Sequence, residues 1–328
     1  AAKLGVEDPD EALELVASAL RMVKRYRLEH VLAPHASLHR ELLELGLADP
    51  ELAETAENLA ALTRRVETHF AVTAEPLRLR ARLFGDLDVS LSGRPVPVWT
   101  WRSKKAVSLL ALLLHHRGDP VHRDQAIEAI WPEGDPKRGS KNLNVALTAT
   151  RRGLEQVHPD GSQCLRRQGS FYRIAPEVIE WLDAEEFLDL AAEASNQAGA
   201  GDLEAAVRAA DQALELAGEE YLASEPYADW TARERARLSE LAADLSTRSA
   251  EWLLDLDETD RALVRARAAL TRQPLRERAW LVLMRAYLSR GDRVTALNTY
   301  EECAAVFADQ LGIDPSAELR NLAAFLRR

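Results

Sequence analysis

Cysteine, long apolar runs, glycine and proline are all scarce in this sequence of 328 residues. The two cysteines, Cys164 and Cys303, have no metal-ligand spacing and form no disulfide framework, which fits a reducing compartment. No stretch of about 18 apolar residues occurs and the N-terminus has no signal-peptide pattern, so we expect no membrane span and a cytoplasmic location. With only 15 glycines and 14 prolines, long disordered linkers are not expected. The length then suits two or three folded domains.

The charge is negative overall but unevenly distributed. A net charge of −11 would by itself argue against a nucleic-acid partner. Between Leu77 and Ala175, however, 17 Lys and Arg residues stand against 9 Asp and Glu residues, a balance of +8, and the rest of the chain carries −19. A basic segment in an acidic chain is the electrostatic pattern of a DNA-binding domain, although domains also differ in charge by chance.

The hydrophobic pattern divides the chain into three regions, 1–76, 77–176 and 177–328, and predicts a mainly α protein with a small β component. Residues 1–76 show helical spacing throughout, so we expect a helical segment there. Because the sequence lacks an initial methionine, we interpret that segment as the end of a longer upstream part.

The middle region combines strands, helices and a hairpin. Apolar residues at every second position predict three short strands, over 79–83, 87–91 and 94–98. Apolar residues at helical spacing predict three helices, over 103–116, 123–131 and 140–156. A hairpin over 164–174 follows, and its Gly169-Ser170 turn suits type II′ because glycine stands first. This order of elements predicts a winged helix-turn-helix.

The third helix of the middle region carries the candidate site. At about 100° per residue, an apolar stripe falls on one face and polar groups fall on the other. The predicted buried stripe consists of Leu143, Ala146, Leu147, Thr150 and Leu154. The predicted DNA-binding residues are Lys141, Asn142, Asn144, Val145, Thr148, Arg151 and Arg152. Arginine suits guanine edges or phosphates, asparagine can pair with adenine, and small apolar groups can meet thymine methyls. The outer face has no carboxylate before Glu155, although an ordinary solvated face stays the alternative for this helix alone.

Two further basic clusters flank this helix, and we expect both to contact duplex DNA. They are Arg102, Lys104 and Lys105 at the start of the first helix, and Arg166, Arg167 and Arg173 on the hairpin. The first cluster is placed to hold phosphates, and the second is placed where a wing would reach a neighbouring groove or backbone.

The acidic third region repeats itself. Ala262 lies 34 residues before Ala296, and small residues recur at matching offsets, which predicts stacked helix pairs of the tetratricopeptide type. An earlier copy around Ala206 is out of phase by 22 residues, and we assign much of that excess to residues 217–230. Because loops that interrupt a repeat often lie on a binding face, we expect residues 225–230 to contact a protein partner.

Several runs, in combination, resemble the Streptomyces antibiotic regulatory protein family. They are Trp101-Arg102-Ser103-Lys104-Lys105-Ala106, Ile130-Trp131-Pro132, Lys141-Asn142-Leu143, Arg151-Arg152-Gly153-Leu154, Gly169-Ser170-Phe171-Tyr172, Pro274 to Trp280, and Leu311-Gly312-Ile313-Asp314-Pro315. The likeness runs from Leu77 to the end and implies an OmpR-like winged helix followed by a bacterial transcriptional activator domain of tetratricopeptide type. Residues 1–76 lie outside it and look like the end of a helical sensor region of large MalT-like regulators.

The resemblance implies a transcription activator that binds repeated promoter half-sites as a dimer or tandem pair and recruits RNA polymerase. By position, the loop from Trp131 to Gly139 corresponds to the loop that such activators turn toward polymerase. Its contact residues would be Trp131, Glu133, Asp135, Lys137 and Arg138. Relatives often carry an arginine–leucine pair where this chain has Ala149-Thr150, so base preference does not carry over.

No catalytic, metal or cofactor site is expected. His35 and His39 are four residues apart, but nothing completes a tetrahedral zinc set, and His115-His116 more simply ends the first helix. No nucleophile elbow or phosphate loop occurs either. The competing interpretation is a protein-interaction scaffold whose repeats hold partner peptides without specific DNA binding.

Overall fold

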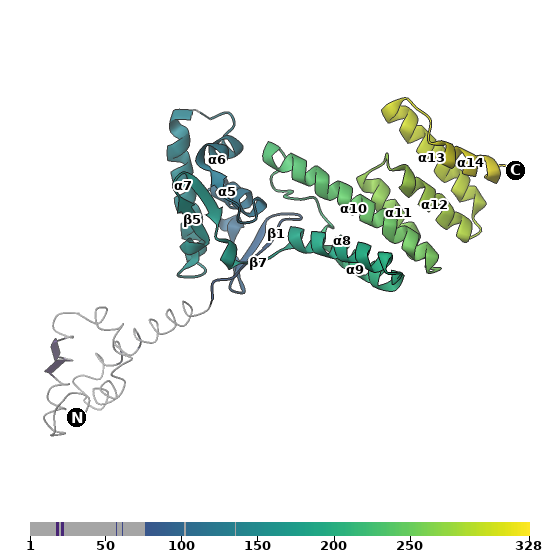
Figure 1. The fold of residues 1–328 in the computed structure, drawn as a ribbon. Coiled ribbons are helices and arrows are strands. Elements are labelled where there is room, and N and C mark those ends of the chain that lie inside the picture. Colours follow the sequence, from purple (N-terminus) through teal and green to yellow (C-terminus); the bar gives the residue numbers. More distant parts are fainter. Residues whose placement is uncertain are drawn as a thin grey trace, which may run out of the picture. The chain divides into compact units, whose positions relative to one another are not determined.

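The computed structural model describes residues 18–19, 21–22, 57, 61, 76–101, 103–134 and 136–328. Apart from those isolated positions, the helical segment predicted for residues 1–76 lies outside the described residues, as do His35 and His39. The chain divides into two compact units, and the fold below is that of the unit formed by Arg78–Val157 and Gly161–Arg328 (Figure 1).

A four-stranded sheet opens this unit, in the order β3-β2-β1-β7. Its strands are β1 (Leu79–Arg82), β2 (Asp88–Leu91), β3 (Arg94–Val96) and β7 (Ile179–Leu182). The first three are antiparallel, and buried and exposed residues alternate along β1 as the period-two pattern predicted. Strand β7 pairs with β1 in parallel, with Leu79 opposite Ile179, and this return of the chain was not predicted.

Three helices and a small second sheet complete the winged helix. The helices are α5 (Lys104–His115), α6 (Arg123–Ile130) and α7 (Pro136–Glu155). The second sheet has the order β4-β6-β5, made by β4 (Val121–His122), β5 (Leu165–Gln168) and β6 (Phe171–Ile174). The three predicted helices and the hairpin are confirmed, with α7 beginning four residues earlier than predicted. Gly169 has φ +61°, as a turn with glycine first requires.

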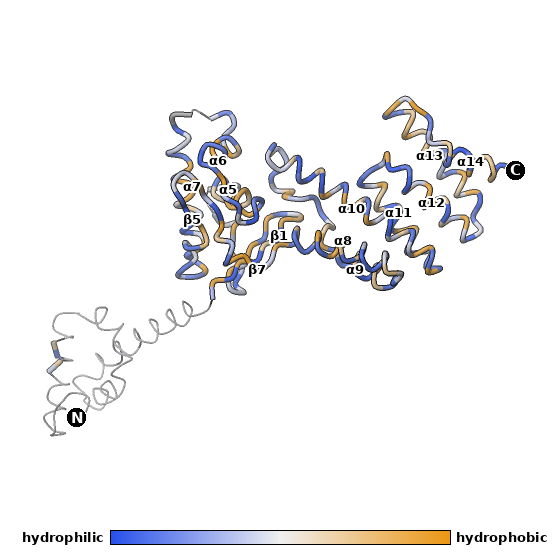
Figure 2. Tube along the Cα trace, in the orientation of Figure 1, coloured by the Kyte–Doolittle hydropathy of each residue, from blue (hydrophilic) through white to orange (hydrophobic). Residues whose placement is uncertain are grey.

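Seven helices follow. They are α8 (Asp183–Gly199), α9 (Leu203–Leu216), α10 (Asp229–Asp255), α11 (Thr259–Arg272), α12 (Glu277–Ser289), α13 (Arg293–Leu311) and α14 (Ala317–Leu326). They stack as the pairs α8–α9, α10–α11 and α12–α13, with α14 against the last pair (Figure 1). Four small residues of the predicted repeat, Ala206, Ala262, Ala296 and Cys303, are fully buried. Figure 2 shows apolar segments recurring along these helices, as the repeat pattern requires.

The turn inside each helix pair has the same backbone conformation. Gly201 (φ +86°) and Gly291 (φ +77°) occupy the left-handed position between the two helices of the first and third pairs. Asp257 (φ +59°) lies 34 residues before Gly291 and occupies that position in the second pair. Aspartate tolerates this conformation better than most side chains do, although glycine suits it best. The equivalent turns confirm the predicted 34-residue repeat.

The winged helix and the repeats join through a contact region that we call the seam. It begins with backbone pairing, in which the amide of Leu222 donates to the carbonyl of Leu83 at 2.6 Å and the amide of Gly85 donates to the carbonyl of Glu220 at 2.8 Å. The buried carboxylate of Asp183, at the start of α8, accepts from the amides of Leu83 (2.8 and 2.9 Å) and Phe84 (2.9 Å). These bonds satisfy the amides at the end of β1 that no strand pairs.

Side chains from α5 and the turn after it extend the seam. Ser108 Oγ donates to Glu225 at 2.5 Å, and His115 Nδ1 lies 3.1 Å from the hydroxyl of Tyr221. An ion pair of 2.7 Å joins Arg117 to Glu234. At the two ends of residues 225–230, Glu225 and Trp230 therefore contact the winged helix. Pro226, Tyr227 (95% exposed) and Asp229 between them face solvent, so the partner contact expected of this loop stays a prediction.

Candidate nucleic-acid interface

Helix α7 presents one face to the core and the opposite face to solvent. The predicted stripe of Leu143, Ala146, Leu147, Thr150 and Leu154 is buried throughout, at 3% exposure or less. Of the predicted DNA-binding residues on α7, five are exposed: Lys141, Asn144, Val145, Thr148 and Arg152. Asn142 and Arg151 are half-buried at the edges of that face. Val145 is 59% exposed on this face, where its methyl groups are accessible to an apolar group such as a thymine methyl.

Two contacts fix α7 against the rest of the winged helix. Thr150 Oγ1 donates within 3.1 Å of the carbonyl of Ala106 and 3.0 Å of the carbonyl of Ala146, so this buried hydroxyl links α7 to α5. Gly153 lies against the Trp101 ring, and a Cβ there would fall 2.2 Å from two ring carbons. Sequence reasoning missed this packing, whose only signal was a glycine inside a strongly periodic helix.

The basic cluster before α5 is positioned by a cap. Ser103 Oγ accepts from the amide of Ala106 at 3.3 Å and so begins α5. Lys104 and Lys105 are both exposed, and Lys105 Nζ donates to the carbonyl of Ile130 at 2.6 Å, at the C-terminal end of α6. Arg102 lies outside the described residues. Trp99, which the sequence did not single out, is 72% exposed in the short 3-10 turn Val98–Thr100 just before this cluster.

The wing carries three arginines with different surroundings. Arg166 and Arg173 face each other across β5 and β6, and Arg166 forms an ion pair with Glu177. Arg167 Nε donates to the carbonyl of Gly169 at 2.9 Å, and its guanidinium lies 5.8 Å from the centre of the Tyr172 ring. The three side chains border a hollow of about 230 Å³ on the wing. The structure thus brings the wing arginines together, with Arg167 shaping the tip and Arg166 partly neutralised.

The proposed polymerase loop is a tight turn between α6 and α7. The amide of Trp131 donates to Ile127 at 2.8 Å and the amide of Gly134 donates to the Trp131 carbonyl at 2.9 Å. Glu133 is exposed, and so is Arg138, which lies in the first turn of α7 together with Lys137. Asp135 lies outside the described residues, as does the side chain of Lys137.

The part of the chain that the structure describes has few other features that suit a ligand or a membrane. There, no group of three or more His, Cys, Asp or Glu side chains could hold a metal ion, and none of the helices has both the length and the apolar character of a membrane span. Burial raises the pKa of both Cys164 and Cys303 to about 12. His115 ends α5 as expected; burial, with His116 next to it, lowers its pKa to about 4.

Comparison with known families matches both parts of this fold. Residues 100–173 match the family described as "Transcriptional regulatory protein, C terminal", and residues 182–327 match the "Bacterial transcriptional activator domain". The first covers the winged helix with α7 and the wing, and the second covers the helical repeats.

Individual relatives agree with these matches. Regulatory protein AfsR of Streptomyces griseus is 30% identical over 236 residues, which are 69% of this chain but only 23% of that protein. Transcriptional regulatory protein MoaR1 of Mycobacterium tuberculosis is 24% identical over 245 residues, covering 73% of this chain and 76% of that protein. The structure of Mycobacterium tuberculosis EmbR in complex with a low affinity phosphopeptide is similar with a TM-score of 0.67 at 26% identity, over 77% of this chain and 66% of that one.

The fold and these matches define a winged-helix transcription regulator. Within that class the chain is SARP-like, of the Streptomyces antibiotic regulatory protein type, with an OmpR-like winged helix followed by a bacterial transcriptional activator domain.

Proposed function

We propose that this regulator binds promoter duplex DNA sequence-specifically, with α7 in the major groove, and activates transcription by contacting RNA polymerase. The observation that carries the proposal is the outer face of α7, where Lys141, Asn144, Thr148 and Arg152 are exposed and no carboxylate precedes Glu155. A face of donors and small groups without acids suits base edges and phosphates better than it suits solvent alone.

The surrounding elements support this placement. Helix α7 has 20 residues and is therefore about 30 Å long. An α-helix with its side chains is about 10–12 Å in diameter, so it fits a major groove about 12 Å wide. Lys104 and the wing arginines lie on elements next to α7, where phosphate contacts fix the position of a recognition helix. In this arrangement α7 selects sequence, and the two flanking clusters supply affinity that depends on salt.

Arg152→Ala tests the proposal in the complete chain. We expect a loss of about 1–3 kcal/mol in binding, measured by fluorescence anisotropy on promoter DNA and on a scrambled duplex at matched salt. A base contact would weaken promoter binding and relax specificity at one position, whereas a phosphate contact would weaken both duplexes alike.

Arg208→Ala is the matched control, because Arg208 is an exposed arginine on α9 in the acidic repeats and should leave binding unchanged. Unchanged affinity in both Arg152→Ala and Arg151→Ala would remove α7 from the interface.

The same proposal assigns protein partners to other surfaces. Trp131, Glu133 and Arg138 border the turn that would face polymerase, with Asp135 and Lys137 beside them in sequence. The acidic repeats repel DNA and so suit contact with polymerase or a second copy of the chain on tandem half-sites, in the cytoplasm at the nucleoid. In a reconstituted transcription assay, we expect the wild type to activate transcription and Glu133→Lys to fail, although both bind DNA with equal affinity.

A second candidate is a peptide-binding scaffold without specific DNA binding, which the tetratricopeptide-type helix pairs favour. A gel shift on random duplex at two salt concentrations separates the two functions, because phosphate neutralisation makes affinity fall steeply with salt. No shift at low salt would favour the scaffold.

A further inference from the structure

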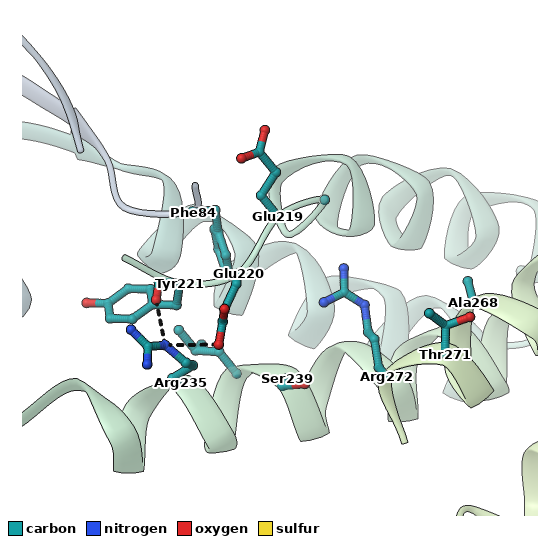
Figure 3. Close-up of a pocket in the computed structure, with 11 residues that line it drawn as sticks. Phe84, Glu219, Glu220, Tyr221, Arg235, Ser239, Ala268, Thr271 and Arg272 are labelled. Carbon is teal, nitrogen blue, oxygen red and sulfur yellow. Dashed lines mark hydrogen bonds and ion pairs between the residues drawn. The ribbon is translucent and has the colours of Figure 1, made fainter. Parts of the chain in front are cut away.

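A cavity of about 590 Å³ lies beside the seam, among residues 218–221, α10 and α11 (Figure 3). Its wall combines apolar side chains (Phe84, Leu238 and Ala268) with the hydroxyl groups of Ser239 and Thr271. This volume lies within the usual range for small-molecule sites, and such a mixed lining is typical of them.

One of the two arginines that border the cavity is fully engaged in holding the fold. Arg235 donates from Nε to the carbonyl of Tyr221 at 2.9 Å and from one terminal nitrogen to the carbonyls of Leu222 (3.1 Å) and Glu225 (3.0 Å). Its Nε also lies 3.3 Å from the carboxylate of Glu220, as the dashed lines in Figure 3 show. Arg235 therefore holds residues 220–226 in place and has little capacity left for a ligand.

The other arginine has no such set of partners. Arg272, at the end of α11, is half-buried and donates to the carbonyl of Ala217, but among the described residues it forms no ion pair with a carboxylate. Figure 3 shows the carboxylate of Glu219 turned away from it. Burial lowers the pKa of Arg272, which reflects the cost of removing a guanidinium from water without a counter-ion. An anion in the cavity would offset that cost.

We propose that this cavity binds a small organic monoanion, a carboxylate carried on an aromatic or branched aliphatic body. A carboxylate can accept two parallel hydrogen bonds from a guanidinium, and the body would cover the wall formed by Phe84, Leu238 and Ala268. Glu219 and Glu220 at the rim disfavour polyanions such as nucleotides, because like charges meet there.

The site would lie where the two domains meet. Phe84 follows β1 of the winged helix, whereas Ala268 and Arg272 belong to α11 of the repeats. A bound monoanion would thus touch both domains, which gives the regulator a place to receive a chemical signal. This inference goes beyond the proposed function, and its test does not involve DNA.

The experiment uses the complete chain and two matched probes, 4-fluorophenylacetate and its neutral analogue 4-fluorophenylacetamide, followed by fluorine NMR. We expect saturable binding of the carboxylate. The amide should bind at least about tenfold more weakly, because only the carboxylate pairs with Arg272. Arg272→Gln should weaken carboxylate binding about ten- to a hundredfold, and Arg208→Gln on α9 should leave it unchanged.

A second variant covers the case in which Arg272→Gln loses stability. Ala268→Leu keeps the guanidinium but fills part of the cavity, so it should weaken both probes while circular dichroism stays unchanged. Absence of saturable carboxylate binding to the wild type, or wild-type carboxylate affinity in both a folded Arg272→Gln and Ala268→Leu, would overturn the proposal. Arg272 would then serve only as a cap for the carbonyls at the end of α9.

Discussion

At the scale of single residues, the contact between Gly153 and Trp101 requires glycine at position 153, although helix propensity alone would favour alanine. Alanine is about 1 kcal/mol better than glycine inside a helix. At Gly153, however, the added Cβ would lie 2.2 Å from the Trp101 ring, so the ring must move. We expect Gly153→Ala to lower the free energy of unfolding by about 1–3 kcal/mol in urea titrations. Gly199→Ala, where nothing lies within 4 Å of the added group, is the control and should not destabilise the chain.

His115 should make stability depend on pH. Burial and then His116 lower its pKa from 6.5 to about 4 in the folded chain, so the unfolded chain binds this proton first as the pH falls. The contribution of His115 is therefore present above about pH 6.5 and is lost as the pH falls toward about 4. Tyr221 and Glu234 face it across the seam, and Arg117 lies beside it in the turn after α5. We expect the urea midpoint to fall between pH 7.5 and 5.

His115→Gln should reduce that dependence and leave a remainder from His116, whose pKa is also lowered by burial. His122→Asn at the start of α6 should keep the dependence of the wild type. Glu234 does not confuse the result, because its hydrogen bond with Arg237 lowers the pKa of Glu234 below the ordinary carboxyl range. A midpoint that falls equally in wild type and His115→Gln would show that other groups carry the pH dependence.

The sequence predicted which residues of α7 are exposed, but it did not predict the hydrogen bonds that side chains form with other helices. The 3.6-residue period placed Leu143 inside and Arg152 outside, as the structure has them. Nothing in the spacing showed that Lys105 caps the end of α6 or that Thr150 bonds to Ala106, because these partners come from other helices.

At the scale of elements, the wing should supply affinity rather than sequence choice. Replacing Arg166 and Arg167 with Ala removes two cations from the hairpin and should reduce the slope of log K against log salt by up to about 2. The ion pair with Glu177 makes the share of Arg166 the smaller one. Binding titrations at four salt concentrations measure the slope, with Arg208→Ala as control. An unchanged slope would mean that these two arginines face away from DNA.

Element prediction succeeded where a period was long enough to read. Helices α5 and α7 and the 34-residue repeat each offer several turns of consistent spacing. Strand β4 has two residues, too few for any period, and β7 owes its existence to pairing with a strand far back in the chain. The contacts of Glu225 and Trp230 with α5 were not predicted for the same reason, because α5 is more than 100 residues away in the sequence.

At the scale of the whole molecule, the winged helix should depend on the repeats for stability. A fragment of residues 77–183 keeps β7 and Asp183 but loses the partners of Leu83, Gly85, His115 and Arg117. We expect its melting temperature to lie about 10 °C or more below that of residues 77–328, because several buried polar groups lose their partners together.

A fragment of residues 77–272 retains the seam and is the control, which should melt closer to the longer chain. If residues 77–183 melt as high as residues 77–328, the seam is only a contact surface. The isolated winged helix could then replace the longer chain in DNA-binding assays. The contacts of the seam predict that it cannot.

The parallel pairing of β7 with β1 also sets an order of events during synthesis. The carboxylate that closes the end of β1 belongs to a residue 100 positions later, and the backbone pairing with Leu222 comes later still. At about 5–20 residues per second, the ribosome needs about 5–20 seconds to supply Asp183 after Leu83. During that time the nascent β1–β2 hairpin has an open edge, and contacts so distant in sequence form slowly even once available. The winged-helix domain of this chain is therefore completed only after the first helix pair of the repeats, α8 and α9, has been translated.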